Sequence, residues 1–416
     1  MTSELAENVK NHRRRTGMSQ EQLAEAADLS VGVIRKLEQG TGGVRVDNLH
    51  AVARALGTTT SALFATGSPD PVHEEGANQS RLVELRRALM PPVGLADVLV
   101  VKAGQPGTLS AIERKIDDAH ALYQSDRYDS VAKMLPGILR SAEAAVSEAD
   151  DGEPRQQATI VRSRALLMTG KYLTQVRQYD MAYHALSLGI QDARETGQTL
   201  LAAMGVVGMS WLLLRQDRSE ECRQLAYTTA QTIEPRMSSA SPGHLAVWGE
   251  LSLRIASAAV RNNEEDESDA AEARKMAAAA ANALAMEHLD FKTHWSTFGP
   301  VTAEIKKVED LSLAGDARGV LRRADDDLLS PKSLRSVGTP SRNNWDRHRL
   351  DVAKAHVKLG SHQDAMDELN GMLQTSPTWL KHQRMARHVM QDILRARKRT
   401  LTKDMRIMAA HLGIVG

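Results

Sequence analysis

MSQEQLAEAADLSVGVIRKLEQG, residues 18–40, is the stretch that decides the fold of the N-terminal part of the chain. Ser19 and, three residues later, Gln22 have the spacing of a capping box, in which each side chain accepts a hydrogen bond from the backbone of the other residue. This spacing predicts a helix that begins directly after Ser19. The apolar residues of this helix, at helical spacing, are Leu23, Ala26 and Ala27.

A second short helix is expected after a break at Leu29. Ser30 is a suitable N-cap for it, and Gly40 is the residue type that most often ends a helix. Its inward residues are expected to be Val33, Ile34 and Leu37, and its outward residues Val31, Gly32, Arg35 and Lys36. Two short helices joined by a tight turn, with small and cationic side chains on the second, are suited to the DNA major groove.

The surrounding sequence resembles a known family. Residues 11–64 resemble the five-helix Xre/Cro-type helix-turn-helix domain at its apolar and turn positions. A preceding helix is expected over residues 3–16 and a later one over residues 47–56, and residues 60–64 would close the domain. The expected fold of this part is therefore a five-helix DNA-binding domain.

The same resemblance implies roles for individual residues. Gln20 would contact a phosphate, and Arg45 and Asn48 would reach the flanking DNA backbone. The residues placed in the major groove are Ser30, Val31, Gly32, Arg35 and Lys36. Gly32 lacks a side chain where the family often has a polar base reader, so base contacts would rest on Arg35, Lys36 and the methyl groups of Val31. Arg13 would form a structural ion pair with Glu38.

Composition predicts an all-α protein. The 416 residues are enough for two or three domains, and they are 42% hydrophobic but only 3% aromatic. Ala, Leu and Met dominate, which favours helices over strands. Residues 1–66 contain eight Lys and Arg against seven Asp and Glu, so DNA affinity would depend on where the charges lie. The single cysteine, Cys222, and the absence of a signal peptide or apolar span predict a soluble, cytoplasmic protein.

The chain divides into three predicted regions. Residues 1–66 form the helix-turn-helix domain, and residues 67–109 form a linker with one short helix over residues 81–90. Residues 110–416 read as helix after helix and are expected to form a repeat domain that binds an effector and dimerises. The predicted fold is therefore an N-terminal helix-turn-helix domain followed by an α-solenoid of tetratricopeptide-like hairpins.

Two stretches carry the repeat pattern clearly. In residues 166–189, Gly170, Tyr179 and Ala182 lie at the small and aromatic positions where paired helices touch. A second copy spans residues 347–377. Weaker copies lie at residues 126–138, 206–229 and 313–328, and residues 244–286 form a further hairpin. Cys222 falls on a small-residue site and is expected to be a packing residue, while residues 330–346 are expected to be irregular.

This layout also resembles a group of actinobacterial regulators that combine an Xre domain with degenerate tetratricopeptide repeats. Residues 294–321 are similar to a segment that recurs in that group. The peptide-pheromone receptors of Gram-positive bacteria combine the same two modules. His294, Trp295 and Phe298 are separate candidates for ligand contact, although aromatic residues at helical spacing more often lie in the core.

A groove along stacked hairpins is lined by the first helix of each. A peptide ligand would need side-chain amides for its backbone and a cation for its carboxylate. The predicted ligand-binding residues are Arg164, Lys171, Gln175, Trp211, Arg215 and Lys354. The alternative, that these charges form an ordinary solvated helix face, stays open.

No motif points to catalysis. The sequence has no glycine-rich phosphate loop, no histidine pair at metal-ligand spacing and no nucleophile elbow, so no catalytic residue, metal or cofactor is expected. The leading hypothesis is a homodimeric, sequence-specific transcriptional regulator that binds double-stranded DNA and a peptide or small-molecule effector. The alternative is a protein-interaction adaptor whose repeat domain binds a partner protein and whose head locates it on DNA.

Overall fold

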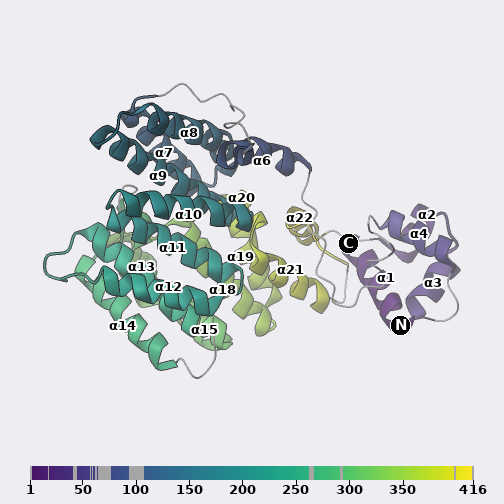
Figure 1. Ribbon diagram of the computed structural model, residues 1–416. Coiled ribbons are helices and arrows are strands. Elements are labelled where there is room, and N and C mark those ends of the chain that lie inside the picture. Colours follow the sequence, from purple (N-terminus) through teal and green to yellow (C-terminus); the bar gives the residue numbers. More distant parts are fainter. Residues whose placement is uncertain are drawn as a thin grey trace. The chain divides into compact units, whose positions relative to one another are not determined.

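The computed structural model of the chain consists almost entirely of helices (Figure 1). The described residues are 2–16, 18–40, 45–56, 58, 60, 63, 76–92, 107–261, 267–290, 294–397 and 400–414. Contacts divide the chain into two compact units, residues 1–74 with 356–416 and residues 75–355, and each is described by itself. Among the described residues, none of the helices combines the length and the apolar character that a membrane span needs.

The N-terminal module of the first unit contains four described helices, α1 Thr2–Thr16, α2 Gln20–Ala26, α3 Val31–Gln39 and α4 Val46–Ala55. Ser19 and Gln22 form the predicted capping box. The fully buried side chains include Val9, Leu23, Ile34 and Val52. Ala26, predicted to face inward, is exposed, and Ala24 is buried instead, because residues 23, 24 and 27 share the side of α2 that packs on the core. The predicted fifth helix, residues 60–64, lies mostly outside the described residues.

The C-terminal part of the first unit is a group of four helices. They are α19 His362–Thr375, α20 Pro377–Lys381, α21 Arg384–Ala396 and α22 Lys403–His411. α19 packs against the other three, and its Leu369 and Met372 are buried. The Nε2 atom of His411 lies 2.8 Å from the carbonyl oxygen of Pro377, and this contact holds α22 to the start of α20.

The second unit is a stack of helical hairpins. Its helices are α6 Gly76–Leu89, α7 Leu109–Gln124, α8 Tyr128–Glu148, α9 Glu153–Gln175, α10 Tyr179–Glu195, α11 Thr199–Arg215, α12 Ser219–Thr232, α13 Pro242–Ala259, α14 Glu267–Leu284, α15 Pro300–Ala314, α16 Ala317–Arg323, α17 Pro331–Val337 and α18 Arg342–Lys358, with the 3-10 turn η2 Asp327–Leu329. Hairpins form between α7 and α8, α9 and α10, α11 and α12, and α13 and α14. α6 begins at Gly76, inside the stretch expected to be linker.

One turn recurs between the two helices of a hairpin. A residue with positive φ follows the first helix, and the next residue donates its N–H to the carbonyl group five positions back, which satisfies the helix end. The residues with positive φ are Asp126, Arg177, Asp217 and Gly315, and the accepting carbonyl groups belong to Leu122, Leu173, Leu213 and Leu311. The same turn follows α18 at Gly360, where the N–H of Ser361 donates to the carbonyl group of His356. The repeat is therefore carried by backbone geometry, which glycine marks in the sequence at some of these turns but not at Asp126, Arg177 and Asp217.

The predicted close contact between α9 and α10 is confirmed. A Cβ on Gly170 would lie 2.5 Å from Leu186 Cγ, and one on Gly189 would lie 2.8 Å from Leu167 Cγ. Both distances are too short for a side chain, so glycine lets the two helices approach. Cys222 is fully buried on α12, which confirms its packing role, and burial raises the pKa of its thiol to about 11.

Two stretches differ from the sequence analysis. Residues 330–346, expected to be irregular, contain α17 and the first turn of α18, because Ser330 caps α17 with its side chain and Pro331 suits a first helical position. Strands β1 His288–Asp290 and β2 His294–Phe298 form an antiparallel pair, the one sheet among the described residues. Phe298 is fully buried, as expected of a core residue, and packs on α13 at Gly249.

Candidate functional site

The helix-turn-helix elements are fastened by a buried ion pair, as the family resemblance implied. Arg13 of α1 donates from Nε to Glu38 Oε1 at 2.5 Å and from Nη2 to Glu38 Oε2 at 2.9 Å. Its Nη1 donates to the carbonyl group of Met18 at 2.9 Å. The side chains of Arg13 and Glu38 are only 12% and 4% exposed. The pair holds α3 to α1, and Arg13 also holds the segment between α1 and α2.

Gln20, predicted to contact a phosphate, also belongs to this arrangement. Its Nε2 donates to Glu38 Oε2 at 2.8 Å, and the side chain is half-buried. The amide therefore bonds within the protein in this structure. The backbone N–H of Gln20 lies in the first turn of α2, where helix N–H groups lack internal partners.

The outward side of α3 carries the residues expected in the major groove. Ser30, Gly32, Arg35 and Lys36 are exposed, whereas Val31 is half-buried and packs against the core. Ser30 is the N-cap residue by backbone geometry, but its hydroxyl makes no capping hydrogen bond. A Cβ on Gly32 would approach nothing nearer than Ser30 Oγ at 3.9 Å. The structure thus brings these residues together on one accessible side.

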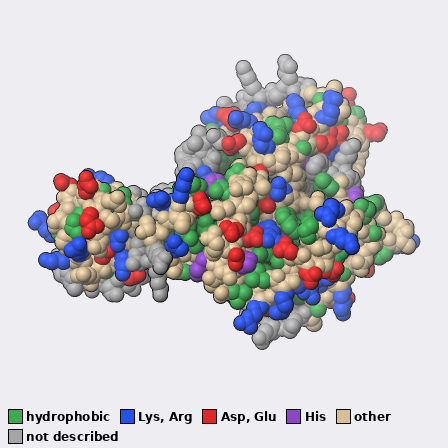
Figure 2. Space-filling model, turned by 180° about the vertical axis from the view of Figure 1, so that it is seen from behind, with side chains coloured by type: hydrophobic (Ala, Val, Ile, Leu, Met, Phe, Trp, Pro, Cys, Tyr) green, Lys and Arg blue, Asp and Glu red, His purple; other side chains and the backbone are tan. Residues whose placement is uncertain are grey.

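The cations of this module pair weakly with neighbouring acids. Arg35 lies 3.5 Å from Glu21, with side chains 59% and 62% exposed. Arg45 lies 3.8 Å from Asp47 in a still more exposed pair, and Asn48 is half-buried. Figure 2 shows basic and acidic side chains intermixed on the face of the N-terminal module that it displays. Exposed pairs of this kind exchange readily for other anions, such as phosphate.

In the second unit, the first helices of successive hairpins contact one another. α7 packs on α9, α9 on α11, and α11 on α13. The hydroxyl of Tyr128, at the start of α8, donates to Asn343 Oδ1 of α18 at 3.4 Å. α18 therefore meets the first hairpin although the two residues are 215 positions apart. The predicted ligand-binding residues all lie on these first helices and on α18.

Two of the predicted ligand-binding cations have partners of their own. Arg164 is 6% exposed and donates to Glu113 at 2.8 Å and to Asp117 at 3.0 Å, both on α7. Lys354 donates from Nζ to the carbonyl oxygen of Ser312 at 3.1 Å. These contacts join neighbouring helices of the stack, so both residues have a structural role.

Lys171 and Arg215 are in a different environment. The Nζ of Lys171 lies 4.8 Å from the ring centroid of the buried Tyr123, and the guanidinium of Arg215 lies 5.0 Å from that of Trp211. Burial lowers the pKa of Lys171 to about 7, although the charge of Glu250 raises it. Burial also lowers the pKa of Arg215. Each side chain nevertheless keeps part of its surface accessible to solvent.

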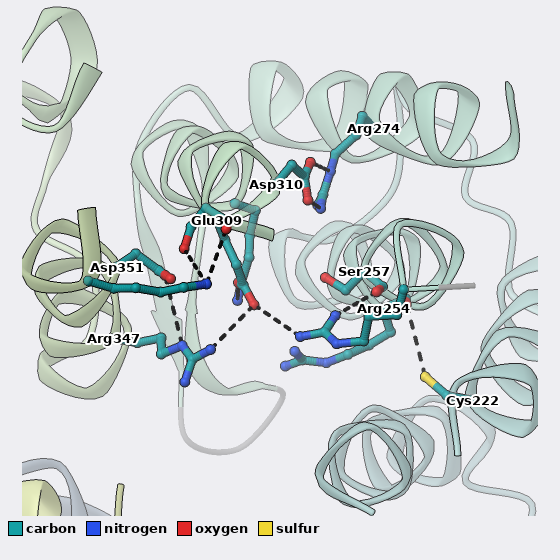
Figure 3. Close-up of polar contacts among 12 residues, drawn as sticks. Cys222, Arg254, Ser257, Arg274, Glu309, Asp310, Arg347 and Asp351 are labelled. Carbon is teal, nitrogen blue, oxygen red and sulfur yellow. Dashed lines mark hydrogen bonds and ion pairs between the residues drawn. The ribbon is translucent and has the colours of Figure 1, made fainter. Parts of the chain in front are cut away.

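A buried charge network, which the sequence reasoning missed, surrounds Glu309 (Figure 3), and its Arg347 acts on the pKa of Arg215. Glu309 of α15 accepts hydrogen bonds from Lys306 and, at 3.5 Å, from Arg261, and it forms an ion pair with Arg347 at 4.0 Å. Arg347 also lies 3.9 Å from Asp351, whose pKa burial raises to about 6. The signal in the sequence was the spacing of four between the last two residues, which puts both on one side of α18.

Tyr123 and Tyr179 were also missed as neighbours of the predicted ligand-binding residues. Tyr123 lies against Lys171, and Tyr179 is close enough to act on the pKa of Arg215. The recurring turn could have found Tyr179, because Tyr128 occupies the same position in the preceding hairpin, two residues after the positive φ.

Comparison with known proteins agrees with the N-terminal module. Residues 4–65 match the family described as a helix-turn-helix domain. The crystal structure of Bacillus thuringiensis PlcR in complex with the peptide PapR7 and DNA is similar to this chain at 10% sequence identity and a TM-score of 0.31, covering 95% of this chain and 100% of that one. None of the curated proteins matches the chain. The chain thus contains a helix-turn-helix domain at its N-terminus.

Proposed function

We propose that the chain is a sequence-specific transcriptional regulator of the Xre type. The observation that carries the proposal is the outward side of α3, where small and cationic residues lie together on a helix fixed by the Arg13–Glu38 pair. The family match over residues 4–65 supports it. A rigidly held second helix with an accessible outer side is what base recognition in the major groove requires.

The proposed DNA contacts divide into two kinds. Arg35 and Lys36 would reach base edges or phosphates, and Gly32 would let the backbone of α3 come close to the bases. The hydroxyl of Ser30, which makes no capping bond, would be available for a further contact. Arg45 and Asn48 would bind the flanking phosphates, and Gln20 would do so through its backbone N–H.

The second unit would bind the effector. Lys171, Gln175, Trp211 and Arg215 lie on first helices and would recognise a peptide or small molecule, while Arg164 and Lys354 would hold neighbouring helices in place. A homodimer would present two DNA-binding modules to two half-sites, and effector binding would change the population of the arrangement that fits both. Such a regulator would act in the cytoplasm, where bacterial DNA lies.

The first experiment is genome-wide immunoprecipitation of the tagged protein, followed by binding measurements on an enriched site. The double variant Arg35→Ala plus Lys36→Ala should weaken binding by about 1–3 kcal/mol for each lost contact. It should also make binding less sensitive to salt. Lys275→Ala, which removes an exposed cation of α14, is the control and should bind as the unchanged protein does. Equal binding by all three proteins would refute the assignment of α3.

Gly32 gives an independent test of close approach. Because a Cβ there meets no atom nearer than 3.9 Å, Gly32→Gln should leave the protein folded. In the complex the longer side chain would stand between α3 and the bases, so affinity for the enriched site should change while stability does not fall. Unchanged affinity and unchanged sequence preference would argue against this placement.

The dimer is tested by sedimentation with and without DNA carrying an inverted repeat. A dimer on the repeat, and weaker binding to a single half-site, is the expected result. A monomer in both conditions would exclude the dimeric mechanism.

A further inference from the structure

Two polar groups near the end of the first helix of one hairpin lack a hydrogen-bond partner. The side chain of Gln175 is 1% exposed, and its Nε2 has no acceptor. The hydroxyl of Tyr179, at the start of α10, is also buried without a partner. Native proteins satisfy nearly all buried polar groups, so an unsatisfied pair this close in the chain indicates a bond that another molecule completes.

Positive charge surrounds these two groups. Lys171 lies one helical turn before Gln175 on the same side of α9. Arg215 belongs to α11, which packs on α9, and it lies near Tyr179. Tyr123 connects the two cations, because its ring lies 4.8 Å from Lys171 and its hydroxyl acts on Arg215.

Other cations lie near Arg215. Burial is the largest cause that lowers the pKa of Arg215, and Arg347 and Arg177 lower it further, whereas Tyr179 and Tyr123 raise it. The charge of Glu250 acts on Lys171, and Glu250 is also paired with Arg254 at 2.9 Å. Like charges gathered in a poorly hydrated place repel one another, and an anion among them would remove that repulsion.

The geometry points to an anion-binding site on the inner side of the hairpin stack, where Gln175 and Tyr179 donate hydrogen bonds and Lys171 and Arg215 supply charge to a carboxylate or phosphate group. Neutral donors beside a guanidinium and an ammonium group suit an oxyanion with several oxygen atoms. The inference rests on the effector binding proposed above and names the chemical group recognised there.

The test uses the full chain and two kinds of probe. The first is inorganic phosphate, compared with chloride at equal ionic strength. The second is a tripeptide with a free C-terminal carboxylate, compared with the same peptide amidated. The readout is the rise of the unfolding temperature with probe concentration, which gives a dissociation constant. A rise with phosphate assigns the site to phosphorylated ligands, and a rise with only the free peptide assigns it to carboxylates.

Variants separate the site from general salt effects. Gln175→Met and Tyr179→Phe should each weaken binding of the effective probe about tenfold or more, since each removes one donor. Without probe, both variants should be at least as stable as the unchanged protein, because each removes an unsatisfied buried group. Gln191→Met, at an exposed position of α10, is the control and should bind the probe normally.

Two results would overturn the site. One is that neither probe stabilises the unchanged protein, and the other is that every variant is stabilised equally. DNA binding to the enriched genomic site is measured in parallel. Specific DNA binding without any effect of either probe would exclude the anion site and leave the proposed regulator standing.

Discussion

Breaking the ion pair between Arg13 and Glu38 should destabilise the helix-turn-helix domain far more than breaking an exposed pair. Glu38→Ala leaves the guanidinium of Arg13, 12% exposed, with the carbonyl group of Met18 as its remaining acceptor among the contacts described above. It also removes the acceptor of Gln20 Nε2. Arg13→Ala leaves a carboxylate that is only 4% exposed.

The size of the effect follows from this geometry. Removing one partner of a buried pair typically costs about 3–5 kcal/mol, and the partial exposure of Arg13 puts the expected loss at the lower end. Removing both partners should cost less than the sum of the two single changes, because neither charge is then left alone. The coupling energy of the double-mutant cycle should be about 2 kcal/mol.

Amide hydrogen exchange on the full chain measures the coupling energy, because it reports the opening of α1, α2 and α3 separately from the opening of the other helices. The matched control is the cycle for Arg35 and Glu21, which are 3.5 Å apart and more than half exposed. That cycle should show no resolvable coupling. If the two cycles gave equal coupling, burial would not be what makes the Arg13–Glu38 pair strong, and the reasoning would fail.

Three further outcomes are expected. Gly249→Ala should lower the free energy of unfolding by about 1–3 kcal/mol, because the new Cβ would lie 2.1 Å from Phe298 Cζ. Gly371→Ala, whose Cβ would have no atom within 4 Å, should raise the free energy of unfolding by about 0.5–1 kcal/mol, and chemical denaturation measures both changes. Arg177→Gly should raise it slightly, since φ is 66° there and glycine adopts that value without strain, and an unchanged or lower denaturation midpoint would contradict this. Lys171→Met should stabilise the protein most below pH 7. The pKa of Lys171 is about 7 in the folded protein against 10.5 in the unfolded chain, so between these values the unfolded state binds more protons and the stability of the unchanged protein rises with pH. The advantage of the variant should therefore shrink in a series of denaturation measurements over that pH range.

The elements with strong local signals were predictable. The capping box at Ser19 and the glycine at the end of α3 set the helix boundaries there, and the structure has both. The hairpin of α9 and α10 was predictable because Gly170 marks a contact too close for any side chain. The β-hairpin was not, since its two short strands have no clear alternation, and α17 was hidden because a seven-residue helix carries too little periodicity.

The two candidate sites also differed in how far they could be predicted from the sequence. The exposed side of α3 could be derived because a single helix fixes which residues share a face. The partners of Arg164 could not, because Glu113 and Asp117 lie on another hairpin, and only the stacking of α7 on α9 brings them within reach. The role of Gln175 likewise depends on whether any residue of the folded chain accepts a hydrogen bond from its Nε2. No local sequence pattern contains that information.

The contact between Tyr128 and Asn343 has a consequence for synthesis of the chain. In an open solenoid each hairpin needs only its neighbour, so the first could complete its contacts while the ribosome still makes the rest. Here the first hairpin waits for α18, more than two hundred residues later in translation, before Tyr128 can bond to Asn343. Until then the inner side of the growing stack stays open to water and to chaperones.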